Sequence, residues 1–100
     1  MEYMSPVFSN LAQSFLRKSG MRMKEIIVNT WNEKNHKMFR VIVRSMRWKN
    51  RKTRIRYFAD ITTDCKITNK ETYIDDCVKA LEPAIKEAVR VAWYNRKTGL

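Results

Sequence analysis

Two alternating stretches of sequence, residues 38–47 and 54–62, constrain the fold of this chain more than any other feature. Successive side chains of a strand point to opposite faces, so a period of two predicts a strand with one apolar face. The polar residues 49–52 between the stretches are typical of a turn. We therefore predict an antiparallel hairpin. Its apolar face would carry Phe39, Val41, Val43, Ile55, Tyr57, Ala59 and Ile61, and its other face Arg40, Ile42, Arg44, Arg54, Arg56, Phe58 and Asp60.

A third strand and two helices are predicted around this hairpin. Residues 23–31 are rich in β-forming residues and would extend the hairpin to a three-stranded meander. Residues 5–18 repeat apolar side chains at a helical period, with Ser5 as N-cap and Pro6 at the first helical position. Residues 70–95 carry a longer apolar stripe of the same period.

The limits of the helices can also be predicted. Gly20 is expected to end the first helix in a left-handed conformation. Residues 63–68 are expected to form a connector, and Thr68 to Glu71 fit a capping box at the start of the second helix. The apolar stripe keeps its phase across Pro83, so we expect one kinked helix or two nearly collinear helices.

The predicted fold class is α+β. A helix, a three-stranded antiparallel sheet and a long C-terminal helix follow one another, with both helices packed on one face of the sheet. The 100 residues suffice for one compact domain and not for two. We expect this domain to span residues 1–100, with frayed ends at about 1–4 and 96–100.

The charge of the chain is strongly and unevenly basic. The formal net charge is +11, and residues 34–59 contain ten Lys or Arg and no Asp or Glu. Such a charge repels itself in a compact fold unless a partner neutralises it. A polyanion is the expected partner, nucleic acid first and an acidic protein surface second.

The predicted hairpin would gather these cations on one sheet face and in the adjoining turns. Lys and Arg neutralise phosphates, and exposed aromatic rings stack on unpaired bases. Alternating arginines can also simply solvate a half-exposed sheet. A solvated face normally mixes both signs of charge, so the lack of acids favours binding. The candidate nucleic-acid-binding residues are Lys37, Arg40, Arg44, Arg47, Trp48, Lys49, Arg51, Lys52, Arg54, Arg56 and Phe58.

Apolar residues among these arginines leave a protein partner open. Ile42, Met46, Trp48 and Phe58 fall on the same predicted face. Trp, Phe, Met and Arg are enriched in protein interfaces. A homodimer through this face, or through an unpaired sheet edge, is therefore an alternative.

No pattern indicates an enzyme, a metal site or a cofactor. Cys65 and Cys77 lack metal-ligand spacing, are too few for a disulfide scaffold, and are predicted to be reduced thiols; His36 is the sole histidine. Asp60, Asp64 and Glu71 have no Lys or His at a recognisable catalytic spacing. We predict a non-enzymatic protein with no catalytic residue, metal or cofactor.

The N-terminal residues do not resemble a secretory signal. Glu2 stands where a basic segment would be needed, and polar residues interrupt the apolar run that follows. No stretch approaches the roughly 18 apolar residues that span a bilayer. The prediction is a cytoplasmic protein, inside the host cell if it is viral, that is not secreted and has no membrane partner.

The order helix, three strands, helix resembles that of the double-stranded-RNA-binding domain. Residues 7–20 would match its first helix, and the segment 35–41 would match the loop and strand in which that family places a His before a Phe. The resemblance implies that His36 enters a minor groove. The family's lysine cluster at the start of its second helix is not matched, because residues 69–73 contain one lysine and one glutamate.

Two functions are therefore expected, in order. The first is a nucleic-acid-binding protein, with RNA ahead of DNA, that uses the basic sheet face and the adjoining turns. The second is a small viral or phage-type inhibitor or adaptor that docks on an acidic host protein.

Overall fold

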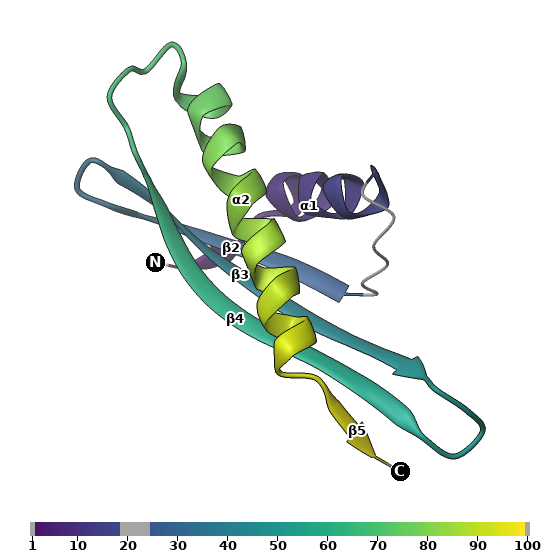
Figure 1. Cartoon of the computed structure of the whole chain (residues 1–100). Helices are drawn as coiled ribbons and strands as arrows, with labels where there is room; N and C mark the ends of the chain where they lie inside the picture. The colour runs from purple at the N-terminus through teal and green to yellow at the C-terminus, as the bar shows by residue number, and fades with distance from the viewer. Residues whose placement is uncertain (1, 19–24, 100) are drawn as a thin grey trace.

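The computed structural model describes residues 2–18 and 25–99, which form an α+β fold in which one antiparallel sheet carries two helices (Figure 1). The sheet order is β1-β2-β3-β4-β5. The molecule is elongated, 51 × 26 × 21 Å, because β3 and β4 form a long hairpin. In chain order the elements are β1 Tyr3–Met4, α1 Pro6–Lys18, β2 Glu25–Glu33, β3 His36–Trp48, β4 Arg54–Lys66, α2 Tyr73–Tyr94 and β5 Lys97–Gly99.

The central hairpin is present and longer than predicted. β3 and β4 have 13 residues each and pair along their whole length, from His36 opposite Lys66 to Trp48 opposite Arg54. The connector predicted over residues 63–68 is therefore wrong for its first part, which belongs to β4. β-branched Thr62 and Thr63 favour the extended chain there, and Thr63 pairs with Phe39 of β3.

The prediction of a three-stranded sheet is wrong, because two short edge strands bring the sheet to five strands. β1 pairs Tyr3 with Thr30 of β2, and β5 pairs Lys97 with Arg56 of β4. Both lie in segments that we expected to fray, because neither carries an alternating apolar pattern. These strands form through backbone hydrogen bonds to the exposed edges of β2 and β4, and such bonds leave no signal in the side-chain sequence.

Both helices cover the same face of the sheet, as predicted. Ser5 Oγ accepts a hydrogen bond from the Phe8 backbone N–H at 3.3 Å and so acts as the predicted N-cap of α1. The Phe8 ring meets the Phe39 ring edge-on, with centroids 5.2 Å apart. The predicted stop at Gly20 and the first two residues of the predicted strand 23–31 lie outside the described residues. The core comprises Ala12, Leu16, Ile26, Val28, Phe39, Val41, Val43, Tyr57, Ala59, Cys77, Leu81, Ala84, Ile85, Ala88, Val89 and Ala92.

α2 is one helix that runs through Pro83, and its start differs from the prediction. The capping box from Thr68 to Glu71 does not form, because the Glu71 backbone N–H donates to Asn69 Oδ1 at 2.9 Å outside the helix. Thr72 is the N-cap, without a side-chain cap bond. The turn at Asn69 therefore uses the Glu71 backbone N–H, which in a capping box would donate to the Thr68 side chain.

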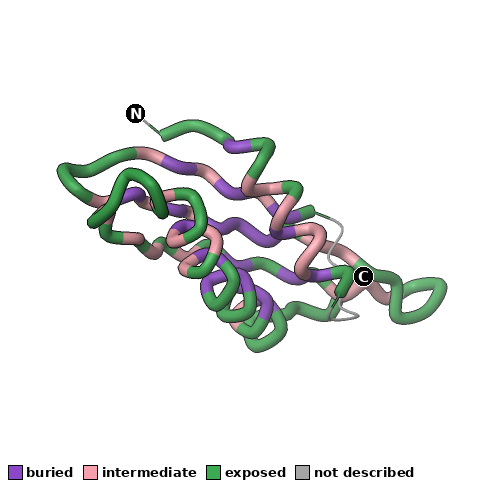
Figure 2. The backbone as a smooth tube through the Cα atoms, turned by 90° about the horizontal axis from the view of Figure 1, so that it is seen from above, coloured by how far each residue is buried: buried purple, intermediate pink, exposed green. Residues whose placement is uncertain are grey.

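Burial follows the strand alternation. Figure 2 shows buried stretches alternating with less buried ones along the strands, whereas the turns and ends are exposed. Odd-numbered residues of β3 and β4 face the helices. The even-numbered residues of these strands, with the odd-numbered residues of β2 beside them, form the opposite face, which we call the open face.

Candidate nucleic-acid interface

Three cross-strand pairs at the turn end of the open face each join an arginine to an apolar side chain. Arg44 is opposite Phe58, Met46 opposite Arg56, and Trp48 opposite Arg54. Residues directly opposite on one face of an antiparallel sheet have neighbouring side chains. The alternation between strands therefore sets every cation beside an apolar group. We call these six residues the arginine ladder.

Three side chains of the ladder, those of Met46, Trp48 and Arg54, contact one another. Arg54 Cζ lies 5.3 Å from the centroid of the Trp48 ring, within the range of a cation–π contact. Arg54 Nη1 lies 3.8 Å from Met46 Sδ. Trp48 remains 55% exposed and Phe58 52% exposed. The ladder thus presents two exposed aromatic rings, with the partly buried guanidinium of Arg54 beside Trp48.

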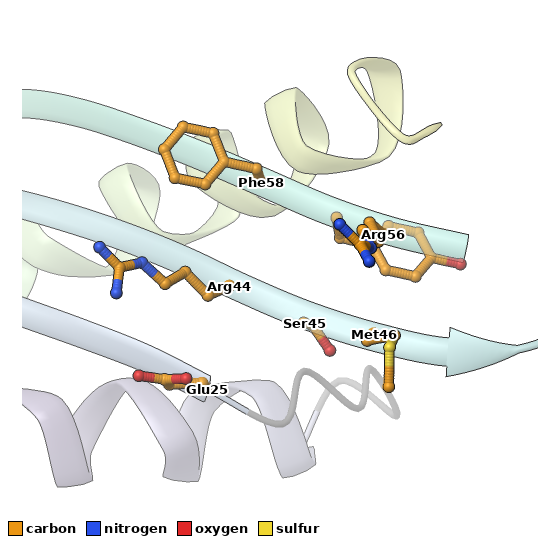
Figure 3. A pocket seen from close by; sticks show the side chains of 7 residues that line it. Glu25, Arg44, Ser45, Met46, Arg56 and Phe58 are labelled. Carbon is orange, nitrogen blue, oxygen red and sulfur yellow. The ribbon is translucent and has the colours of Figure 1, made fainter. Parts of the chain in front are cut away.

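A shallow hollow of about 700 Å³ runs along one side of the ladder. It lies where β2 starts at Glu25 while β3 and β4 continue, and Figure 3 shows Arg44, Arg56 and Phe58 projecting from adjacent strands around it. Glu25 is opposite Arg44 and is the carboxylate that lines the hollow. The hollow therefore combines cationic and apolar walls.

The turn beyond the ladder displays further cations. Asn50 Oδ1 accepts hydrogen bonds from the backbone N–H groups of Lys52 and Thr53, at 2.9 and 2.8 Å, and so organises the turn. Lys49, Arg51 and Lys52 are exposed there. Three of the predicted binding residues therefore lie exposed in the turn that joins the two strands of the ladder.

Between Ile42 and the end of the hairpin at His36 and Lys66, the open face differs in chemistry from the arginine ladder. Ile42 lies between Ile27 and Asp60 and is 8% exposed, so it is covered by its neighbours and does not offer the exposed apolar side chain that we predicted. Past this row the open face carries paired polar groups. We call Glu2, Asn29, His36, Arg40, Asp60 and Asp64 the carboxylate half.

Arg40 belongs to this half and is engaged by two carboxylates. Its Nε and Nη2 donate to Asp60 at 2.8 and 2.6 Å, and its Nη1 lies 3.3 Å from Glu2 Oε1. The hydrogen bonds from Arg40 hold the pKa of Asp60 below its usual range, and those to Asp60 and Glu2 raise the pKa of Arg40. Arg40 is thus occupied within the fold, unlike the free phosphate ligand that its position in the sequence predicts.

Lys37 and Arg47 do not lie on the open face. Both are odd-numbered residues of β3 and point toward the helix side. Lys37 is 5% exposed, and its Nζ lies 3.4 Å from the Tyr3 hydroxyl oxygen and 5.6 Å from the centroid of that ring. The edge strand β1 therefore covers Lys37 and removes it from the predicted set. Arg47 is exposed near the turn.

His36 takes a structural position in the carboxylate half. Its Nδ1 lies 2.6 Å from Asp64 Oδ2 across the β3–β4 pair. The resemblance to the double-stranded-RNA-binding domain places a free His in a loop, whereas this His begins β3 and is held by a carboxylate.

One cation of the interface was missed by sequence reasoning. Lys97 lies beside Arg56 on the open face because β5 pairs there. The sequence gives no signal for it, since β5 forms by backbone pairing. The contact of Arg40 with Asp60 is diagonal across the hairpin, because Thr62 is directly opposite Arg40, so it depends on the register of β3 and β4.

The remaining chemistry of the described residues is sparse. They hold no group of three or more His, Cys, Asp or Glu side chains that could bind a metal ion. Cys65 and Cys77 are free thiols, and burial raises the pKa of Cys77 to about 11, which makes it a weak nucleophile at neutral pH. Neither described helix is long and apolar enough to cross a membrane.

We compared the chain with known protein families, curated proteins and solved structures. No protein-family model, no curated protein and no solved structure matches this chain. The geometry of the open face is therefore the basis for any assignment.

Proposed function

We propose that this is a non-enzymatic nucleic-acid-binding protein, with RNA preferred over DNA, that uses the arginine ladder and the turn of residues 49–52. One observation carries the proposal: each of the three ladder pairs joins an arginine to an apolar side chain on the sheet face opposite the two described helices. Arginine binds phosphate oxygens in a bidentate way and stacks on bases. An exposed aromatic ring stacks on any base.

The charge pattern supports the same surface. Arg44, Arg54, Arg56, Lys49, Arg51, Lys52 and Lys97 bring seven cations to the ladder and its borders. Within residues 2–18 and 25–99, no ion pair joins Arg44 or Arg56 to a carboxylate. Cations that are not neutralised within the protein can release counterions from a phosphate backbone, and this release drives association.

Binding measured against salt concentration tests the proposal. The affinity for fluorescein-labelled RNA and DNA oligonucleotides should fall steeply between about 50 and 200 mM salt. Arg56→Glu with Lys52→Glu should reduce the affinity by roughly 100-fold, because two phosphate contacts become repulsive. The control, Lys79→Glu with Lys86→Glu, changes two exposed lysines of α2 and should have a much smaller effect. Absence of binding at the lowest salt would refute the proposal.

A second candidate is a small viral or phage-type inhibitor or adaptor that docks on an acidic protein. Exposed Trp48 and Phe58 beside arginines favour it, since aromatic residues and Arg dominate the binding energy of many protein interfaces. Capture from a nuclease-treated lysate separates the two functions. A stoichiometric protein partner that survives nuclease supports the adaptor, and loss of every partner argues against it.

A further inference from the structure

Two exposed aromatic rings stand at opposite ends of the arginine ladder. Phe58 projects from β4 and Trp48 from β3, and each has more than half of its surface in solvent. The register sets them two alternate positions apart, which is about 13 Å along the strands. Two exposed rings beside arginines on one sheet face form the kind of patch that marks a binding surface.

The space between the rings is lined by cations and a thioether. Arg54 lies against the Trp48 ring and near the Met46 sulfur, so its guanidinium plane is held in place rather than free to swing. Arg56 lies two residues further along β4, beside Lys97 of β5. A nucleic-acid strand whose bases stack on both rings would therefore place its phosphates near Arg54, Arg56 and Lys97.

Base stacking on these rings requires unpaired bases. In a duplex each base is already stacked between its neighbours, so only its edges are accessible in the grooves. A side chain on a sheet surface can reach the flat face of a base only when the strand is single or opened.

The carboxylate half also disfavours a duplex. A duplex is stiff over lengths far greater than this molecule, so a duplex aligned with β3 and β4 would continue past the ladder. Its phosphates would then approach Glu2, Asp60 and Asp64. A single strand is flexible and can leave the sheet at Ile42.

From these observations we propose that the arginine ladder selects single-stranded nucleic acid by stacking unpaired bases on Phe58 and Trp48. This inference rests on the proposed function and names its substrate class. The distance between the rings and the adjoining turn correspond to a short site of about four nucleotides.

Competition between single strands and a duplex tests the selectivity. Full-length protein is titrated into a labelled oligouridine of about 12 nucleotides and into an RNA duplex of equal length at the same salt concentration. The single strand should bind at least tenfold more tightly. Trp48→Leu with Phe58→Leu should weaken single-strand binding by roughly tenfold or more per ring, with the salt dependence unchanged because no charge is removed.

Two matched variants separate stacking from other effects. Trp48→Tyr with Phe58→Tyr retains both rings and should retain most of the affinity. Tyr94→Leu removes an exposed ring of α2, 87% in solvent, and should leave the affinity unchanged. In a Trp31→Phe, Trp93→Phe background, the fluorescence of the remaining Trp48 should be quenched by oligouridine.

The outcomes distinguish this inference from the function on which it rests. Equal or tighter duplex binding, or full single-strand affinity in the folded Trp48→Leu, Phe58→Leu variant, overturns single-strand selection and leaves nucleic-acid binding intact. Absence of binding to any oligonucleotide refutes both. Circular dichroism establishes that each variant is folded.

Discussion

The arginine ladder and the carboxylate half occupy one open sheet face, yet an arginine has different neighbours in each. Arg40 and Arg56 are both even-numbered residues of the hairpin. Arg40 is bound by Asp60 and Glu2, whereas Arg56 lies beside Met46 and Lys97. A guanidinium already paired with carboxylates gains little free energy from contact with a phosphate. Arg40 and Arg56 are therefore expected to differ in affinity for phosphate although both lie on the open face.

The comparison also shows why a charge count misleads. Residues 34–59 contain no acid, but acids from outside that segment fold against its first part. The second part has Glu25 opposite Arg44 but gains Lys97 opposite Arg56. The uniform run of cations in the sequence becomes a polarised surface in three dimensions.

The largest expected difference between the halves is in phosphate contact. Arg56→Gln should weaken nucleic-acid binding by roughly fivefold to eightfold at about 0.1 M salt and lower the salt slope by about 0.7–0.9, because one phosphate contact is lost. Arg40→Gln should leave that slope unchanged. Fluorescence anisotropy at several salt concentrations measures both, and equal slope changes in the two variants would contradict the division of the face.

A smaller effect is expected when the carboxylate half is made to resemble the ladder. Asp60→Asn with Glu2→Gln removes both carboxylates that bind Arg40 while keeping the shape of each side chain. Arg40 would then be available, and the affinity should rise by roughly threefold to eightfold. Glu82→Gln with Glu87→Gln on α2 is the control with the same change in net charge. An equal gain in the control would attribute the effect to net charge alone.

The smallest effect concerns acid stability. Arg40 holds the pKa of Asp60 below the usual aspartate value of 3.8, so this pair stabilises the fold at pH values above about 4. The contribution should be lost as the pH falls through the lowered pKa of the folded state, where Asp60 gains a proton. Urea unfolding of wild-type protein and Arg40→Gln at several acid pH values measures it. The two proteins should converge in stability as the pH falls, and a constant gap would contradict this role of the pair.

Side-chain patterns predicted much of this fold correctly. The alternation of Phe39, Val41 and Val43 identified the buried face of β3, since side chains that pack against the helices are mostly apolar. The same alternation placed Arg44, Arg54 and Arg56 together on the opposite face. Ser5 was also identified as the cap of α1, because capping depends on residues within one turn.

The sequence by itself thus determined the alternation, the hairpin and the excess of positive charge, because each depends on residues close together in the chain. Only the tertiary structure decided which cations remain available. β1 covers Lys37, Glu2 and Asp60 bind Arg40, and β5 adds Lys97 to the ladder. These contacts join residues that are 20 to 41 positions apart in the sequence, as with Arg40 and Asp60 or Arg56 and Lys97. Their formation depends on strand register and backbone pairing at the sheet edges, which no local pattern of side chains encodes.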